Sequence, residues 1–181
     1  MSRSLEQIQW NGVVFNKMGR GSNSVVFSDE HNTCVIKILH RPRTLPYEIE
    51  LLNLYCQLAP EYSPCPVATI KLDNGPFYGI LMKNVGPCLY DARKFLQFHE
   101  KIYLMMQMTD IILCISDNLG ISDFHSENIC VFQRGAMIRL KLIDCAAWDS
   151  EEDFTISTWI QNLYLIKRLW MDIYPKYDDL L

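Results

Sequence analysis

The stretch Gly19-Arg20-Gly21-Ser22-Asn23-Ser24-Val25-Val26-Phe27 constrains the fold of this 181-residue chain more than any other. Two glycines separated by one residue precede a run of apolar residues, a pattern typical of a turn between two strands. Glycine has no Cβ, so the backbone N–H groups of such a turn can approach a phosphate closely. On this segment alone, a plain hairpin with glycines at its turn is the preferred interpretation.

The first 83 residues are predicted to form an antiparallel sheet with one helix. The expected strands are Val13–Phe15 continuing to Gly19, Val25–Phe27, Cys34–Leu39, Val67–Leu72 and Phe77–Met82. The last two flank Asp73-Asn74-Gly75, which is a strong hairpin signal. A partly buried helix is expected to begin near Pro46 and to end before Pro60.

Composition changes after Gly86-Pro87, and residues 84–181 are predicted to be mainly helical. A long buried helix is expected at Glu100–Asn118, because apolar residues occupy most of its circumference. A short strand pair, Ile129–Phe132 with Arg139–Ile143, should follow. The last expected element is a helix near Thr155–Trp170, whose apolar stripe is Trp159, Leu163, Ile166 and Trp170. The fold class is therefore α+β, with two domains at 1–83 and 84–181.

The composition limits the partners and the compartment. A hydrophobic content of 49%, a charged content of 21% and a net charge of −4 indicate a globular chain. The negative charge argues against nucleic acid or an anionic membrane as the main partner. No secretory signal peptide and no membrane-spanning run are expected. The seven cysteines are odd in number and form no Cys-x-x-Cys pair, so we expect free thiols in a reducing, cytoplasmic compartment.

Lys37 is a charged residue within the otherwise apolar strand Cys34–Leu39. A lysine on the solvent face of a strand is ordinary. Its position shortly after the glycine segment, however, would allow the ammonium to bridge two phosphates. Glu48 on the following helix could pair with Lys37, with Glu50 as the second candidate, and a solvated helix face is the alternative for both.

The most informative polar segment is Asp123-Phe124-His125-Ser126-Glu127-Asn128. An aspartate here could orient or deprotonate a hydroxyl, and an asparagine five residues later could donate its carbonyl to Mg²⁺. Asp144 follows an apolar strand, where a carboxylate is costly unless it is paired or binds a metal. His125 is interpreted as a loop histidine without chemistry, in preference to a positive group near a phosphoryl.

Together these segments resemble the protein-kinase signature: a glycine loop, a strand lysine, a helix glutamate, a catalytic loop and a metal-binding aspartate. The resemblance covers about residues 10–145 and implies a bilobal fold with an N-lobe at 1–83 and a truncated C-lobe at 84–181. ATP and Mg²⁺ are the implied cofactors. The implied roles are ATP binding by Gly19, Gly21, Ser22, Ser24, Val26, Lys37, Met82 and Asn84, catalysis by Asp123, Lys37 and Glu48, and Mg²⁺ ligation by Asn128 and Asp144.

The chain also departs from the kinase pattern. Ile121-Ser122 replaces the usual His-Arg, and Cys145-Ala146 replaces the Phe-Gly after the metal-binding aspartate. His125 stands where protein kinases have lysine, which is similar to the loop of aminoglycoside-type phosphotransferases. Only 37 residues follow Asp144, too few for a full activation segment and the later helices of a large kinase. We therefore expect activity that does not depend on phosphorylation of a loop in this region.

Such a reduced core resembles the minimal type III effector kinases of bacterial pathogens, of the OspG/NleH kind or the HopBF kind. The resemblance implies a monomeric serine/threonine protein kinase that is secreted into a host cytoplasm and acts on a host protein. An HSP90-type chaperone or an E2–ubiquitin conjugate is the implied partner. A small-molecule phosphotransferase of the aminoglycoside-kinase type and a pseudokinase binding module are the alternatives, and a viral source would give a similar chain.

Overall fold

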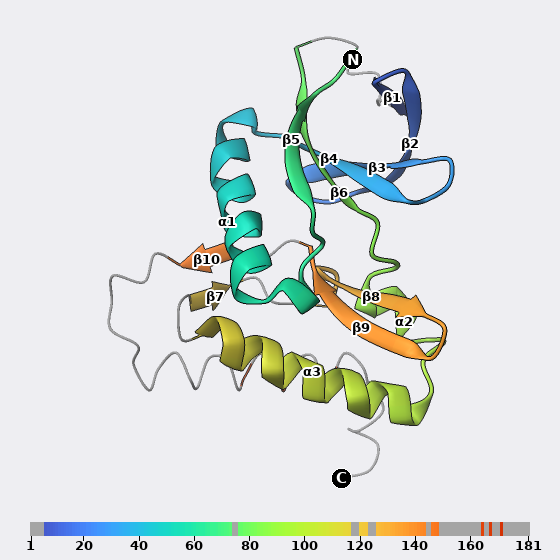
Figure 1. The fold of residues 1–181 in the computed structure, drawn as a ribbon, viewed down its shortest axis with the longest axis vertical. Coiled ribbons are helices and arrows are strands. Elements are labelled where there is room, and N and C mark those ends of the chain that lie inside the picture. Colours follow the sequence, from blue (N-terminus) through green and yellow to red (C-terminus); the bar gives the residue numbers. More distant parts are fainter. Residues whose placement is uncertain are drawn as a thin grey trace. The chain divides into compact units, whose positions relative to one another are not determined.

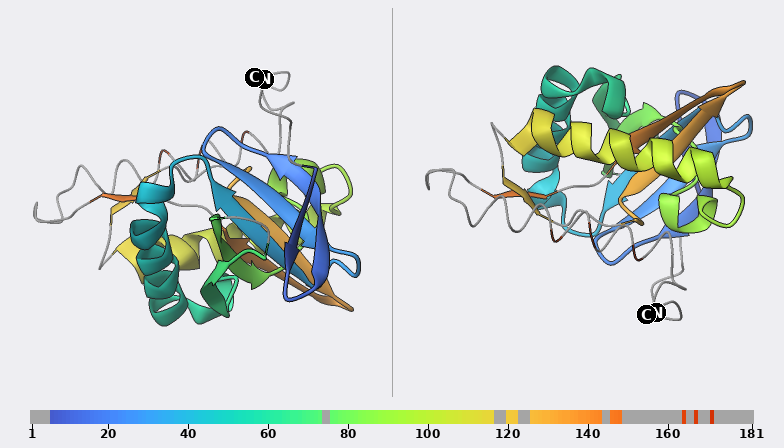
Figure 2. Two further views of the ribbon diagram at one scale, coloured as in Figure 1. Left: turned by 90° about the horizontal axis from the view of Figure 1, so that it is seen from above. Right: turned by 90° about the horizontal axis from the view of Figure 1, so that it is seen from below.

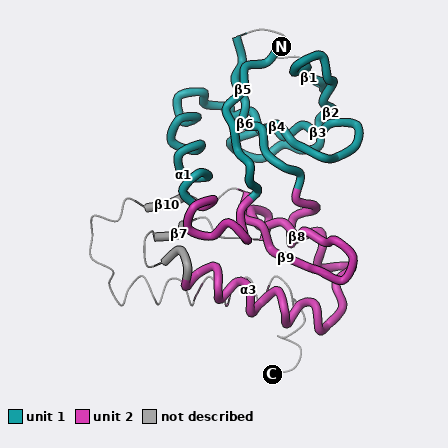
Figure 3. Tube along the Cα trace, viewed as in Figure 1, with its two compact units in different colours: residues 1–54, 64–84 teal, residues 55–63, 85–181 magenta. Residues whose placement is uncertain are grey.

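The computed structural model describes residues 6–73, 76–116, 120–122, 126–143 and 146–148, with Tyr164, Lys167 and Met171. The chain forms two compact units (Figure 3): residues 1–54 with 64–84, and residues 55–63 with 85–181. The predicted domains, 1–83 and 84–181, differ from these units mainly in residues 55–63, which group with the second unit.

Unit 1 is a six-stranded antiparallel sheet with one α-helix (Figure 1). Its strands, in the order β1-β2-β3-β4-β6-β5, are β1 (Gln7–Trp10), β2 (Val13–Arg20), β3 (Ser24–Asp29), β4 (Cys34–Leu39), β6 (Tyr78–Lys83) and β5 (Val67–Lys71). The 3-10 turn η1 (Pro42–Thr44) leads into α1 (Leu45–Leu58), with Pro46 in the first turn, where proline is tolerated. The predicted α+β class, with an N-terminal antiparallel sheet and one helix, is confirmed.

The central strand β4 is buried on both faces. Ile36 packs with Phe15, Phe27 and other apolar residues on the inner face of the curled sheet. Its neighbour Val35 points to the opposite face and packs with Leu52 of α1. Because side chains alternate along a strand, Lys37 shares the α1 face with Val35.

The strand β1 was not predicted from the sequence. It forms a tight hairpin with β2 in which Trp10 pairs with Val13, and the two turn residues, Asn11 and Gly12, have φ values of 49° and 75°. Asn-Gly is the preferred dipeptide for such a turn, so the signal was present in the sequence. After β5, Asp73 donates its N–H to Gln9 O (3.0 Å), and its Oδ2 accepts from Gly12 N (2.9 Å). These hydrogen bonds link the chain after β5, one edge strand of the sheet, to the hairpin of β1, the other edge strand.

Unit 2 contains a long helix, short strand pairs and the segment 55–63 (Figure 2). Its elements are η2 (Pro60–Tyr62), α2 (Leu89–Ala92), α3 (Phe98–Ser116), β7 (Gly120–Ser122) paired with β10 (Ala146–Trp148), and β8 (Ile129–Arg134) paired with β9 (Met137–Leu142). The predicted strand pair at 129–143 is thus confirmed, whereas α2 and the β7–β10 pair were not predicted. The helix α3 contains no segment long and apolar enough to cross a membrane, and neither does any other described helix.

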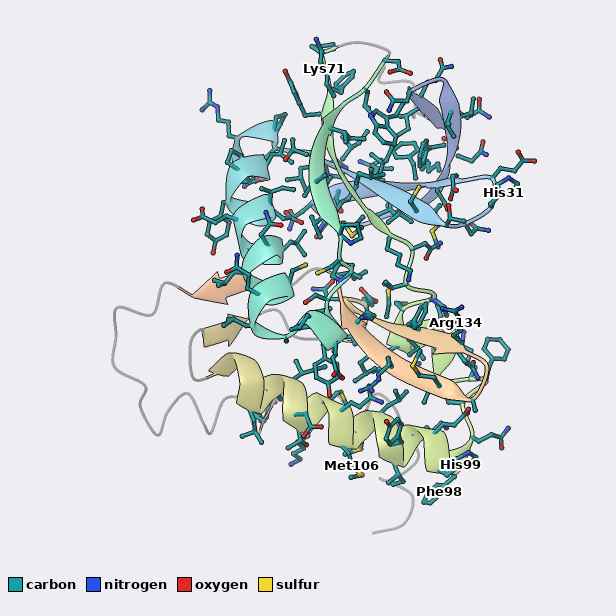
Figure 4. All side chains as sticks on the ribbon, viewed as in Figure 1. His31, Lys71, Phe98, His99, Met106 and Arg134 are labelled. Carbon is teal, nitrogen blue, oxygen red and sulfur yellow. The ribbon has the colours of Figure 1, made fainter. Side chains whose placement is uncertain are left out.

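A buried glutamine joins α3 to β9. Gln107 is 2% exposed, and its Nε2 donates to Ile138 O (3.0 Å) while its Oε1 accepts from Leu140 N (2.9 Å). One side chain therefore satisfies two backbone groups on the edge of β9 that faces away from β8. Phe98 and Met106 lie on the side of α3 away from these strands (Figure 4), and both are exposed.

The last predicted helix falls largely outside the described residues. Tyr164, Lys167 and Met171 are helical and exposed, and the predicted apolar stripe, Trp159, Leu163, Ile166 and Trp170, lies outside the description.

The expectation of free thiols is wrong for Cys56 and Cys65, which are disulfide-bonded. An odd number of cysteines excludes complete pairing but still allows some of them to pair. Cys34, Cys88 and Cys130 are free. Burial is the main cause that raises the pKa of the Cys88 and Cys130 thiols, that of Cys130 to about 12.

Candidate functional site

The strand lysine and the helix glutamate form an ion pair within unit 1. Lys37 Nζ on β4 donates to Glu48 Oε1 on α1. Lys37 is 4% exposed and the Glu48 side chain is 20% exposed, so the alternative that places Lys37 on a solvated strand face is wrong. Glu50, the second candidate partner, is exposed. The predicted pairing with Glu48 is confirmed, and its role in catalysis stays a prediction.

Lys37 has an apolar neighbour on each of the two adjacent strands. In the sheet it stands opposite Val26 of β3 on one side and Ile80 of β6 on the other. Val26 is one of the predicted nucleotide-binding residues, and the register places it beside the lysine. A buried ammonium in such surroundings is costly unless it is paired, which is what the carboxylate of Glu48 provides.

A turn after β3 fixes the register of the lysine strand. The carboxylate of Asp29 accepts hydrogen bonds from Thr33 N (2.7 Å), from Cys34 N (3.1 Å) and from the Thr33 hydroxyl. Partial burial acts to raise the pKa of Asp29, but these hydrogen bonds outweigh it, so the pKa lies below its ordinary value. The charged Asp29 therefore holds the backbone at Thr33 and Cys34, where β4 begins, three residues before Lys37.

The glycine segment forms the end of β2 and the turn into β3. Gly19 pairs with Val26 after a shift in register, and Gly21 N donates to Ser24 O (2.9 Å). No described atom lies within 4 Å of a Cβ built on Gly19, and one built on Gly21 approaches only Ser24, at 3.9 Å. Neither glycine has a positive φ. Internal packing and backbone conformation therefore do not require glycine at either position, which leaves the space beside the backbone available to a ligand.

His40 anchors the tip of this turn, and this role was not predicted from the sequence. Its backbone N donates to Asn23 O (2.8 Å), and its ring Nδ1 lies 3.0 Å from Ser22 O. A carbonyl oxygen can only accept, so the ring is protonated at Nδ1 in this contact. The turn that contains Ser22 is thus anchored to the end of β4. Ser24, the other predicted serine, is buried where β3 begins.

Met82 and Asn84 lie at the end of β6. Met82 is buried and pairs in register with Val35 of β4. It belongs to the same core group as Leu52 of α1. The backbone N of Asn84 donates to Thr33 O (3.0 Å), which ties the chain after β6 to the start of β4. Both residues thus border the lysine strand in unit 1, and adenine binding by them stays a prediction.

The predicted metal ligands belong to unit 2. Asn128 is buried, and its backbone O accepts from Ile143 N (3.1 Å), which extends the β8–β9 pairing by one residue. Ile143 directly precedes Asp144 in the chain. Asp144 and Asp123 lie outside the described residues. Within the described part of the chain, no group of three or more His, Cys, Asp or Glu residues could hold a metal ion.

No protein-family model matches the chain, and no curated protein matches its sequence. The functional argument therefore rests on the residues and on their geometry.

Proposed function

We propose that this protein is an ATP- and Mg²⁺-dependent protein kinase that phosphorylates serine or threonine. The observation that carries the proposal is the buried ion pair between Lys37 and Glu48. In protein kinases a lysine on the strand after the glycine hairpin contacts the phosphates, and a glutamate on the next helix holds it in place. Lys37 and Glu48 occupy the corresponding elements, β4 after the β2–β3 hairpin and α1.

Each residue of unit 1 has a definite task in this proposal. Lys37 would bind two phosphates of ATP, while Glu48 keeps its ammonium in one orientation. The backbone around Gly19 and Gly21 would cover the phosphates, since open space remains where side chains would otherwise stand. Met82 and Asn84 would border the adenine. These interactions orient the nucleotide, and positioning is the larger part of catalysis in phosphoryl transfer.

Unit 2 would supply the groups that act on the metal and the acceptor. Mg²⁺ neutralises charge on the phosphates when it is bound, and the oxygen atoms of Asn128 and Asp144 are the ligand type it prefers. Asp123 would accept the proton of the acceptor hydroxyl as that oxygen attacks the terminal phosphorus and ADP leaves. The backbone bond from Ile143 to Asn128 supports this assignment, because it anchors the residue before Asp144 beside Asn128.

The test is transfer of label from γ-labelled ATP with Mg²⁺. The acceptors are a serine/threonine peptide library, a purified HSP90-type chaperone, an E2–ubiquitin conjugate and an aminoglycoside. We expect label on serine or threonine of a protein or peptide. Asp144→Ala should lose Mg²⁺-dependent ATP binding, whereas Asp123→Ala should keep it and lose turnover. Asp110→Asn, an exposed change on α3, is the matched control and should behave as the native chain.

The outcomes separate the alternatives. Label on the aminoglycoside alone would favour a small-molecule phosphotransferase, and ATP binding without transfer to any acceptor would favour a pseudokinase binding module. Either result would overturn the protein-kinase proposal. By resemblance to the effector kinases, we also propose a host protein as acceptor in a host cytoplasm, and the two purified host partners in the assay address that point directly.

A further inference from the structure

Two free cysteines face each other in unit 2. Cys88 immediately precedes α2, and Cys130 lies on β8. The backbones of these two residues pair as an isolated antiparallel β-bridge. Cys88 is partly exposed and Cys130 is buried. Nothing in the proposed kinase function uses either thiol.

The hydrogen bond beside the bridge shows which type of pair the two cysteines make. Val131 N donates to Pro87 O (2.9 Å), so the bond joins the residue before Cys88 to the residue after Cys130. That pattern makes Cys88 and Cys130 a non-hydrogen-bonded pair, in which the Cα atoms are about 4.5 Å apart and the side chains lie on one face. Disulfides form across Cα separations of roughly 4.4–6.8 Å, so this backbone arrangement is compatible with a bond between the two.

The backbone around the pair is closely fitted. A Cβ built on Gly86, which has a φ of +94°, would lie only 2.4 Å from Val131 O. The chain before Cys88 therefore passes against β8 at a distance that only glycine permits. Tyr90 N also donates to Ser126 O (3.1 Å), on the other side of the bridge. Contacts on both sides thus hold Cys88 opposite Cys130 in the reduced protein.

We propose that Cys88 and Cys130 form a redox modification site, at which a small-molecule disulfide oxidises the two thiols to a disulfide that joins the start of α2 to β8. The partly exposed Cys88 reacts first. Its sulfur attacks one sulfur of the small disulfide, which releases one thiol and leaves a mixed disulfide on Cys88. The Cys130 sulfur then attacks the Cys88 sulfur and releases the second thiol. The protein loses two protons and two electrons, and the small disulfide gains them as two thiols.

The experiment uses the full chain, first reduced and then incubated for hours with oxidised glutathione, because protonated thiols exchange slowly. Remaining thiols are blocked with N-ethylmaleimide, and the protein is digested without reductant for mass spectrometry. We expect a linked peptide pair that contains Cys88 and Cys130 and that disappears on addition of dithiothreitol. The oxidised protein should also have a higher midpoint of thermal unfolding than the reduced protein, since a disulfide restricts the unfolded chain.

Three variants make the proposal falsifiable. Cys130→Ala should accumulate glutathione on Cys88, because the second thiol is missing, while Cys88→Ser should leave Cys130 unmodified. Cys34→Ser, which changes another partly exposed free cysteine, is the control and should form the same linked peptides as the native chain. Melting curves under reducing conditions verify that each variant is folded. Equal accumulation of the glutathione adduct on Cys88 in the native chain and in Cys130→Ala would overturn the proposal, as would linkage of either cysteine to a different one.

Discussion

Replacement of Lys37 by methionine separates its part in folding from its proposed part in catalysis. Methionine keeps most of the apolar stem between Val26 and Ile80 but removes the charge. The carboxylate of Glu48 then loses the ammonium with which it forms its ion pair. Loss of one partner from a fully buried pair costs about 3–5 kcal/mol, and the solvent access of Glu48 places this case near the lower limit, at about 3 kcal/mol.

The second substitution, Glu48→Gln, removes the charge that Lys37→Met leaves behind. We expect the double variant K37M/E48Q to be about 1 kcal/mol less stable than the native chain, because it removes both charges of this ion pair together. Glu48→Gln alone deprives the more deeply buried ammonium of Lys37 of this charged partner and should also cost about 3 kcal/mol, so a double-mutant cycle from denaturant unfolding should give a coupling energy of about 5 kcal/mol. The matched control is Glu50→Gln on the same helix, an exposed change expected to alter stability by less than about 0.5 kcal/mol.

Phosphoryl transfer should not follow stability in this series. We expect both K37M and the double variant to lose on the order of 100- to 1000-fold in kcat, the range typical for removal of one group that stabilises a developing charge. Recovery of stability without recovery of activity would identify Lys37 as a catalytic group. Normal transfer by the folded double variant would refute this reasoning and remove Lys37 from the site.

Three further predictions concern glycine, a buried amide and pH. Gly79→Ala should cost about 1–3 kcal/mol in unfolding free energy, because its Cβ would lie 2.7 Å from the buried Ile36, whereas Gly19→Ala should leave stability unchanged and weaken ATP binding in a titration. Gln107→Leu should cost about 2–4 kcal/mol in denaturant unfolding, because two buried backbone groups of β9 lose their partner. Asp29→Ala should lower the unfolding free energy at pH values above the ordinary carboxyl pKa of 3.8, where the native carboxylate is charged. The difference in unfolding free energy between the variant and the native chain should shrink as the pH falls through the lowered pKa of Asp29 in the folded state. A difference that stays constant from pH 7 to pH 2 would contradict this prediction.

The features that the sequence predicts well are local ones. The strand Cys34–Leu39 was predicted with the bounds that the structure has, because its apolar run lies between a polar turn and a proline. The pairing of Lys37 with Glu48 was also predicted, with Glu50 as the second candidate, because both glutamates lie on the helix that follows the lysine strand. By contrast, β1 was missed although Asn11-Gly12 marks its turn. Polar residues alternate with apolar ones in that strand, and four residues are too few for the period to stand out.

The features that the sequence could not predict depend on residues far apart in the chain. Gln107 gains its role from β9, more than 30 residues later, and nothing local distinguishes it from a polar residue on the surface of α3. The burial of Lys37 was missed for a related reason. A solvated face exists only for a strand that nothing covers, and α1 covers the face of β4 on which Lys37 and Val35 lie.

The geometry of unit 1 also explains why a functional interpretation of Lys37 and Glu48 is stronger than a structural one. A buried ion pair adds little stability compared with apolar residues of similar volume, because both charges must be dehydrated. The neighbours of Lys37 on its face, Val26, Val35 and Ile80, show that an apolar side chain would fit this position. Packing alone explains neither the charge at Lys37 nor the absence of a side chain at Gly19. We propose that both features serve a single purpose, which is the binding and orientation of a phosphate group beside β4.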